Sequence, residues 1–358
     1  EYPFPEAPEN GKALRIADDI IWVRLPLPLS LAHINVYLLE ADEGWIIIDT
    51  GIGGEESQTH WQAIFDTELQ GKPIVAVLVT HMHPDHLGQA GWLSDKFRIP
   101  VYMTLGEYMS ARTISAGPPK TDPWMIRKFM IGAGFDQEYL DNFFKNRGRG
   151  FGSLMEPMPS GYVRIKEGDQ LHWGQSPWQV VIGEGHSPEH ACLYNPARDI
   201  MFSGDQVIAT ISSNISVMAL EPEANPLRLW LQSLEKLKGI SDKTLCLPSH
   251  GLPFYGLHFR LDELIEHHEQ HLAAIIVACE EPKTCRELLP VLFKRELRID
   301  QIGLAVGECI AHLHCLMDRL VIQREADEDG VYRFTTNPDY VGAPRLQNYQ
   351  QMDTPFYV

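Results

Sequence analysis

Short apolar runs separated by polar turns occupy most of the first 255 residues. The run at residues 73–79 is unbroken and rich in Val, which is typical of a strand buried on both faces. Apolar residues then recur at helical spacing over residues 87–97, which predicts a helix. Later short runs end at Ile182, Phe202 and Leu247, and a turn with a small residue follows each of them.

Two parts of the chain repeat one pattern. Residues 37–51 read as strand, turn and strand, and the second strand ends in Asp49. Residues 191–205 repeat this order and end in Asp205. Two such similar halves would place their corresponding edges together.

Residues 105–160, between these halves, hold helical patterns rich in Met and aromatic residues. We expect an ordinary helical hairpin that buries most of these side chains within itself. The alternative interpretation is a lid over a binding site or a contact in a homodimer. The side chains concerned are Met109, Trp124, Met125, Phe129, Met130, Phe135, Tyr139, Phe143 and Phe144.

The C-terminal part of the chain changes to longer helical patterns. These cover residues 260–279, 284–293 and 301–320, and residues 330–334 then read as one arm of a β-wing. The third pattern contains Arg319 as its only Lys or Arg, which does not suit a helix that enters a DNA groove. We therefore expect this region to pack against the rest of the protein, to shape a pocket or to make a dimer.

Five histidines stand in these C-terminal helices. His267 and His271 are four residues apart and could form a metal pair, but no carboxylate motif accompanies them. We expect these two and His268 to lie on a solvated helix face. The same expectation applies to His312 and His314.

Charge and cysteine content limit the classes of partner and the cellular compartment that we expect. The 358 residues include 30 Lys and Arg against 48 Asp and Glu, a formal charge of −18. Because phosphate binding needs clustered positive charge, nucleic acid is a disfavoured partner and small-molecule substrates are favoured. The six cysteines form no Cys-x-x-Cys pair, which fits reduced thiols in a cytoplasmic protein. No apolar run of about 18 residues predicts a membrane span, and the N-terminal segment lacks the features of a signal peptide.

The most informative stretch follows the first buried run. The turn at residues 80–88 contains His81, His83, Asp85 and His86. Side chains at the C-terminal end of a buried strand can converge on one point, and the first two histidines can point together while the other two donors lie to one side. One loop can therefore supply ligands to two adjacent ions. A solvated polar loop is the alternative, but it must account for three imidazoles and a carboxylate within six residues.

Three more candidate ligands follow the later apolar runs, namely His186, Asp205 and His250. Each of them alone is more typical of a structural residue. Together with the loop they make seven donors, enough for two ions with positions left open for water and substrate. Zinc is the metal we expect, with iron or manganese as alternatives, because imidazole suits several first-row ions and no thiolate is in the set.

With these motifs, the sequence resembles the metallo-β-lactamase superfamily of hydrolases. The family loop His-x-His-x-Asp-His stands here at residues 81–86, and the later family histidine, bridging aspartate and last histidine match His186, Asp205 and His250. Asp49 matches the first family motif. The resemblance covers about residues 15–255 and implies a four-layer αββα sandwich.

The resemblance also implies a role for each donor. Asp49 would hold a ligand histidine in its correct tautomer, although a turn-capping aspartate is the alternative. Asp85 and Asp49 are the candidate catalytic carboxylates. The first ion would be held by His81, His83 and His186, the second by Asp85, His86 and His250, and Asp205 would bridge them.

The expected chemistry follows from charge. Two divalent ions, two carboxylates and a bridging hydroxide leave about one net positive charge, which favours an anionic group on the substrate. Water bound to such ions has a pKa near ~7, so hydroxide is available at neutral pH to attack a carbonyl carbon or phosphorus. We therefore expect a binuclear hydrolase that uses a metal-bridging hydroxide on a thioester, ester or lactone.

The expected organisation is a catalytic domain at residues 1–255, with the helical insertion 105–160, and a mostly helical winged-helix-like cap and tail at 256–358. The cap resembles that of the lactamase β2-like branch, which also raises an endoribonuclease or phosphodiesterase as an alternative. A mononuclear-iron persulfide dioxygenase is a further alternative. The final motif, Ser249–Pro253, lacks the basic neighbours that would hold glutathione in a glyoxalase II.

Overall fold

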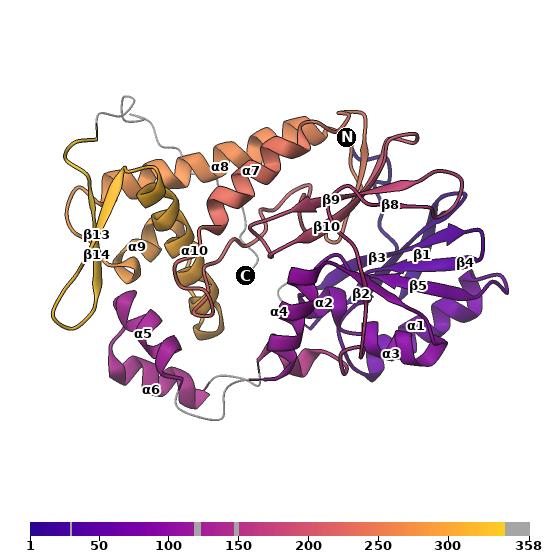
Figure 1. Ribbon diagram of the computed structural model, residues 1–358, viewed down its shortest axis with the longest axis horizontal. Coiled ribbons are helices and arrows are strands. Elements are labelled where there is room, and N and C mark those ends of the chain that lie inside the picture. The colour runs from indigo at the N-terminus through magenta and orange to yellow at the C-terminus, as the bar shows by residue number, and fades with distance from the viewer. Residues whose placement is uncertain (29–30, 118–122, 147–149, 341–358) are drawn as a thin grey trace.

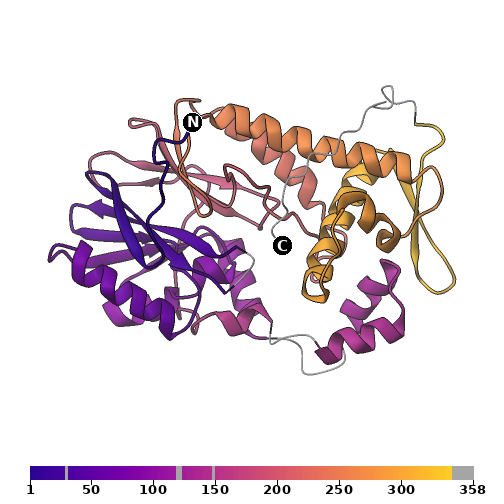
Figure 2. The ribbon, with the colours of Figure 1, turned by 180° about the vertical axis from the view of Figure 1, so that it is seen from behind.

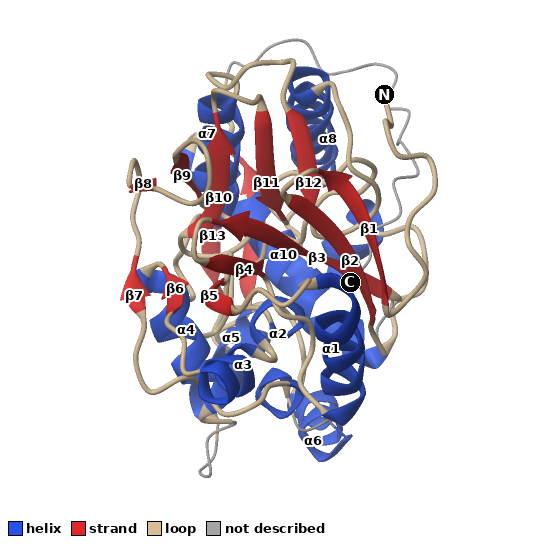
Figure 3. Ribbon diagram, turned by 90° about the vertical axis from the view of Figure 1, so that its right-hand side faces the viewer, coloured by secondary structure: helices blue, strands red, loops and turns tan. Residues whose placement is uncertain are grey.

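The computed structural model describes residues 1–28, 31–117, 123–146 and 150–340. Two β-sheets pack face to face, and helices cover the outer side of each (Figure 1 and Figure 3). A mostly helical region follows at the C-terminal end. This is the four-layer αββα sandwich with a helical C-terminal part that the sequence predicted.

The first sheet has seven strands in chain order. The first four strands pair antiparallel, and the remaining pairs are parallel. The strands are β1 (Lys12–Ala17), β2 (Ile20–Pro26), β3 (His33–Ala41), β4 (Gly44–Ile48), β5 (Ile74–Leu78), β6 (Val101–Met103) and β7 (Val163–Arg164).

The second sheet has the order β12-β11-β10-β9-β8. Only the β11–β12 pair is parallel. The strands are β8 (Gln170–Leu171), β9 (Trp178–Gly183), β10 (His190–Asn195), β11 (Ile200–Gly204) and β12 (Leu245–Pro248). The antiparallel pairs β3–β4 and β10–β11 are the two copies of the repeated sequence pattern.

Helices α1 (Glu55–Glu68), α2 (Pro84–Leu87), α3 (Ala90–Phe97) and α4 (Leu105–Ser115) belong to the first half. The insertion contributes α5 (Trp124–Gly132), α6 (Gln137–Asn146) and the 3-10 helix η1 (Phe151–Leu154). Later elements are α7 (Pro226–Leu237), α8 (Leu257–Ala278), α9 (Cys285–Leu292), α10 (Ile299–Asp318), β13 (Ile322–Ala326) and β14 (Tyr332–Thr336). Strands β13 and β14 pair antiparallel and form a hairpin where the sequence predicted a β-wing.

The described residues form three hydrophobic cores, and side chains that alternate in direction along the central strands form two of them. In β4, Ile46 and Ile48 point into the core between the sheets, whereas Trp45 and Ile47 point toward the core under helices α1 and α3. Successive side chains of a strand point to opposite faces, so an unbroken apolar run suits a strand covered on both sides. This arrangement explains the continuous apolar runs in the sequence.

The third core joins the second sheet to the C-terminal region. It contains Cys192 and Met201 from the sheet, Trp230 from α7, and Leu288 and Val306 from α9 and α10. Helix α8 has 22 residues, a length of about 33 Å, and runs from the sheets to the wing (Figure 2). Because one core extends across residue 255, we retain the two-domain division there as a proposal.

The apolar side chains of the insertion are not buried only within its own helical hairpin. Met130, Phe135 and Leu140 join the core of the C-terminal helices, and Ala133 accepts a hydrogen bond of 2.8 Å from the backbone N–H of Arg286. By contrast, Trp124 is 62% exposed. Helices α5 and α6 thus pack against the C-terminal region, which covers the apolar side of the hairpin (Figure 1).

Two local expectations need correction. The helix predicted over residues 87–97 begins only at Ala90, as α3, because Leu87 ends the short helix α2 and the side-chain amide of Gln89, between the two helices, donates to the carbonyls of Ile52 and Gly54. The five C-terminal histidines do not lie on a solvated face. His267, His268, His271, His312 and His314 are all buried, since α8 and α10 are packed between other elements.

Two further observations concern the described residues. All six cysteines are free and buried. No helix in the described part of the chain has the length and apolar character needed to cross a membrane.

Candidate metal centre

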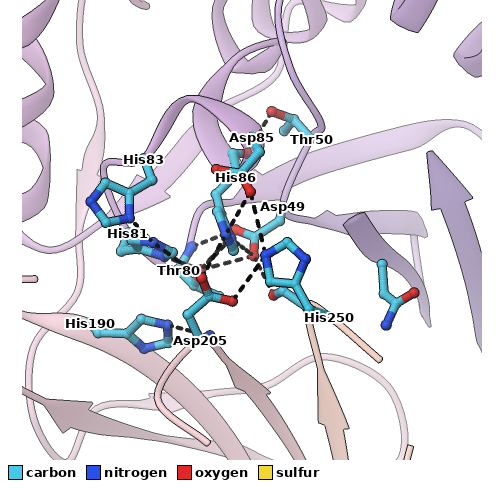
Figure 4. Close-up of polar contacts among 12 residues, drawn as sticks. Asp49, Thr50, Thr80, His81, His83, Asp85, His86, His190, Asp205 and His250 are labelled. Atoms are coloured by element: carbon cyan, nitrogen blue, oxygen red, sulfur yellow. Dashed lines mark hydrogen bonds and ion pairs between the residues drawn. The ribbon is translucent and has the colours of Figure 1, made fainter. Parts of the chain in front are cut away.

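The seven predicted donors meet at one end of the two sheets. Four of them follow β5, and the other three follow β9, β11 and β12, so the ends of four strands supply the whole set. Figure 4 shows the loop histidines, Asp205 and His250 turned toward one another. Segments up to 169 residues apart in the sequence, from His81 to His250, therefore contribute to one cluster.

Three histidines form one side of the cluster. The Nε2 of His81 lies 2.8 Å from Nδ1 of His83 and 3.2 Å from Nε2 of His186. Two nitrogen ligands of a tetrahedral zinc ion, each about 2.0–2.1 Å from the metal, lie about 3.3 Å apart. The three imidazoles thus have the spacing of ligands that share an ion.

A second group lies beside the first. The Nε2 of His250 is 3.4 Å from Oδ2 of Asp85, and the Nε2 of His86 is 3.6 Å from the same oxygen. These three donors also lie within 4.8 Å of one another. The structure therefore brings together the two trios that were expected to hold two separate ions.

Asp205 lies between the two trios. Its Oδ2 is 3.6 Å from Nε2 of His186 and 3.4 Å from Nε2 of His86, and its Oδ1 is 3.5 Å from Nε2 of His250. It contacts donors of both trios, as a bridging carboxylate must.

Two buried atoms of this cluster have no hydrogen-bond partner among the described residues. They are Nε2 of His86 and Oδ1 of Asp205. A buried polar atom without a partner is costly, and each of these atoms points into the cluster, where a cation would satisfy it. The donor set of five imidazoles and two carboxylates fits zinc, iron or manganese.

The pKa values of the histidines differ between the two trios. Burial, together with the neighbouring imidazoles, holds the pKa of His81 well below its usual value and lowers that of His83 to about 3. These rings are neutral and keep a lone pair for a metal. At His250, burial opposes protonation, but the charges of Asp205 and Asp85 and their hydrogen bonds to the ring together outweigh burial and raise the pKa to about 10. A cation that binds beside Asp85 and Asp205 must displace such protons, so binding and pH are coupled.

Backbone and carboxylate partners fix the direction of three rings. Nδ1 of His186 lies 2.8 Å from the carbonyl of Asn214, and Nδ1 of His250 lies 2.9 Å from that of His33. Nδ1 of His86 lies 2.8 Å from Oδ2 of Asp49. Because each Nδ1 faces an acceptor, each Nε2 is left as the nitrogen that faces the cluster.

Asp49 does more than cap a turn. It stands directly after β4 with a left-handed backbone (φ 58°), and its Oδ1 accepts from the backbone N–H of Thr80 at 2.8 Å. The hydroxyl of Thr80 lies 2.8 Å from the other carboxylate oxygen. The carboxylate thus joins the start of the His81 loop to the ring of His86. Its role in positioning that ring for a metal stays a prediction.

The sequence did not reveal Glu107 on α4. This buried carboxyl accepts hydrogen bonds from the backbone N–H of Met82 at 2.8 Å, from the hydroxyl of Ser187 at 2.6 Å and from the backbone N–H of Glu189 at 2.7 Å. Burial raises the pKa of Glu107 to about 7 against the effect of these hydrogen bonds.

His190 also escaped the sequence analysis, although it stands four residues after His186. Its Nε2 accepts from the backbone N–H of Asp205 at 3.0 Å. A Cβ at Gly204 (φ 53°) would lie 2.5 Å from the His190 ring, so glycine is required where β11 turns into Asp205. Only the folded chain shows this contact, because β10 and β11 must pair before the two residues meet.

Comparisons with known proteins agree with this geometry. A sequence model described as the metallo-beta-lactamase superfamily matches residues 30–250, and one described as the metallo-beta-lactamase-like C-terminal domain matches residues 272–337. A probable metallo-hydrolase of Bacillus subtilis (strain 168), YqjP, is 25% identical over 313 residues, which are 84% of this chain and 92% of that protein.

Two solved structures share the fold over nearly the whole chain. A beta-lactamase domain protein from Burkholderia ambifaria is 41% identical with a TM-score of 0.87, and the alignment covers 94% of this chain and 98% of that one. A metallo-beta-lactamase family protein from Thermus thermophilus is 23% identical with a TM-score of 0.76, over 90% of this chain and 100% of that one. The likeness therefore includes the C-terminal helices as well as the sandwich.

Proposed function

Because the chain belongs to the metallo-beta-lactamase superfamily, we propose that it is a binuclear metal-dependent hydrolase. His81, His83 and His186 would hold one divalent cation, and Asp85, His86 and His250 the other. Asp205 would bridge them. Zinc is the proposed metal, with iron or manganese as alternatives of similar ligand preference.

One observation carries this proposal. Asp205 approaches donors of both trios at 3.4–3.6 Å and has a buried oxygen with no hydrogen-bond partner in the described part of the chain. A single mononuclear site would not need a carboxylate between two complete sets of three ligands. The pairing of the sets therefore supports two cations.

The protein residues prepare the site for hydrolysis. The carboxylate of Asp49 orients His86, and the two carbonyl acceptors behind His186 and His250 keep their Nε2 atoms directed inward. Divalent cations held there would supply hydroxide near neutral pH and would stabilise negative charge on the substrate. The two aspartates compensate only part of the cationic charge, so the site suits a substrate with an anionic group.

The proposed substrate is a thioester, ester or lactone of a small molecule. The formal charge of −18 opposes a broad contact with nucleic acid. Helix α10 is the third helix of the C-terminal region and directly precedes β13. It is buried throughout residues 305–316 and contains no Lys or Arg. It is therefore not available to enter a groove, which supports a small molecule over DNA.

A metal assay followed by a substrate panel tests the proposal. Protein loaded with zinc or iron should retain about two ions per chain and should hydrolyse members of a panel of thioesters, lactones and aryl esters, and chelation should abolish the activity. Asp205→Ala should lower metal content and activity together, whereas Asp95→Ala, an exposed residue of α3, should change neither.

Other outcomes would redirect the assignment. Cleavage of single-stranded RNA or a phosphodiester without turnover of the esters would favour the nuclease alternative. A single iron per chain with oxygen uptake would favour a persulfide dioxygenase. A fully metallated and active Asp205→Ala protein would refute the bridging role.

A further inference from the structure

The segment at residues 206–217 connects the proposed bridging aspartate to the rest of the second half; we call it the connecting segment. It touches the metal centre at two points. The carbonyl of Asn214 receives Nδ1 of His186 at 2.8 Å, and the hydroxyl of Ser213 donates to the carbonyl of Asp205. The position of the connecting segment therefore affects two of the seven donors.

C-terminal helices hold this segment from the other side. The buried guanidinium of Arg260 on α8 donates to the carbonyls of Ile208 and Ile211 at 2.7 and 2.8 Å. The backbone N–H of Val217 donates to the carbonyl of Gly307 on α10 at 3.0 Å. A Cβ at Gly307 would lie 2.7 Å from the carbonyl oxygen of Val217, so α10 approaches the segment as closely as a backbone can.

Glu308, the next residue of α10, contacts Asn214, the residue whose carbonyl faces His186. Its Oε2 accepts from the side-chain N–H of Asn214 at 2.6 Å. The other side of that carboxamide is also held, because the hydroxyl of Ser216 lies 2.6 Å from Oδ1 of Asn214. Asn214 is thus fixed at its side chain while its carbonyl faces the ring of His186.

A carboxyl group at this place is costly for the fold. Glu308 is fully buried, and its Oε1 has no hydrogen-bond partner among the described residues. Burial raises its pKa to about 8, with the hydrogen bond from Asn214 acting in the opposite direction. A leucine of similar size would avoid the desolvation of this group, so stability alone does not explain a carboxyl group that faces Asn214.

We propose that Glu308 is a positioning residue of the metal centre: through Asn214 it sets the direction of the His186 ring and keeps its Nε2 toward the proposed first cation. This inference rests on the proposed metal binding. It makes α10 of the C-terminal region a functional part of the site in the sandwich. A partner of a ligand histidine typically changes metal affinity by 10- to 100-fold when it is removed. Because Glu308 acts one residue further away, we expect a loss of about tenfold.

Three variants of the full-length protein test the proposal. Glu308→Leu removes the acceptor for Asn214 at similar volume, whereas Glu308→Gln retains a carbonyl oxygen that can accept the same bond. His314→Leu is the control, because it deletes another buried polar contact of α10, from His314 Nδ1 to the carbonyl of Ala224, which does not lead to His186. Zinc affinity is measured by competition with a chromophoric chelator, and folding is checked by thermal denaturation.

We expect Glu308→Leu to weaken the binding of one of two zinc ions about tenfold, with Glu308→Gln and His314→Leu close to the parent protein. If Glu308→Leu does not fold, Asn214→Ala must show the same loss at one ion. Parent-like affinity in whichever of these two variants is folded would overturn the positioning role. If the parent protein itself takes up no zinc or other divalent ion, the proposed function fails instead, so the two failures are distinguishable.

Discussion

The carboxyl group of Glu107 accepts a hydrogen bond of 2.8 Å from the backbone N–H of Met82, the residue between two of the proposed ligands. Its second oxygen accepts from the hydroxyl of Ser187 and the backbone N–H of Glu189, which follow His186 in the loop between β9 and β10. One side chain of α4 therefore fastens both loops that carry the first histidine trio. The geometry of that trio depends on an element that contributes no ligand.

Glu107→Ala should consequently loosen both loops. Three donors would lose their acceptor, two of them in buried contacts, and we expect a loss of about 1–3 kcal/mol in the free energy of unfolding for each buried donor that stays unpaired. Metal content should fall as well. Urea denaturation and metal analysis measure the two effects, with the exposed Glu138→Ala as control. Unchanged metal content in a folded Glu107→Ala protein would show that α4 does not support the trio.

Asp49→Asn should impair metal binding without a large change in fold. The amide nitrogen cannot accept from Nδ1 of His86, so the ring loses the partner that directs its Nε2. We expect a 10- to 100-fold loss in metal affinity or in activity. Asp199→Asn is the matched control, because Asp199 also has a left-handed backbone (φ 50°) but lies in the turn between β10 and β11. Equal effects of the two substitutions would contradict a specific role for Asp49.

Gly88→Ala should prevent stable folding. A Cβ there would lie 2.4 Å from the nitrogen of Gly53 and from the carbonyl oxygen of Pro84, and backbone atoms cannot move aside as a flexible side chain can. We expect a loss of about 3 kcal/mol or more. In contrast, Gly303→Ala on α10 meets nothing within 4 Å and should stabilise the helix by up to about 1 kcal/mol. Thermal denaturation of both variants checks the contrast.

The buried histidines of the C-terminal region should make the metal-free protein acid-sensitive. Burial is the largest cause that lowers the pKa of His267 and of His312 to about 4, below the usual 6.5. Such groups stabilise the fold fully above pH 6.5, and this contribution is lost as the pH falls toward 4, because the unfolded chain then binds more protons.

Each histidine of this kind contributes a slope of up to about 1.4 kcal/mol per pH unit in that window. His312→Gln should therefore reduce the pH dependence of thermal stability between pH 6.5 and 4 in the chelator-treated protein. His172→Gln, an exposed site, should leave it unchanged. A parent-like slope in the His312 variant would show that this ring is not kept neutral by burial.

The sequence predicted the features that depend on local patterns. Unbroken apolar runs identified β5, β9, β11 and β12, and the turn after each strand contained at least one candidate donor, because a turn at the end of a buried strand lies at a sheet edge. The supporting contacts were not predictable in this way. Glu107, Asn214 and Glu308 carry no motif, and their roles depend on packing between segments distant in sequence.

The prediction that the α8 histidines are exposed was wrong for a different reason. Their charge-capable rings suggested solvent, yet His268 and His271 continue the stripe formed by Leu257, Leu261 and Leu264 at intervals of three and four residues. That spacing indicates a single buried face. The stripe was therefore present in the sequence, and weighing periodicity above residue type would have placed these histidines in the core.

The central claim is that seven donors from four strand ends hold two cations. The most direct test is a crystal structure of the protein grown with zinc, with anomalous scattering recorded at the zinc edge. We expect two peaks about 3.5–4 Å apart, one beside His81, His83 and His186 and one beside Asp85, His86 and His250, with Asp205 between them. A single peak, or zinc bound away from these side chains, would contradict the account.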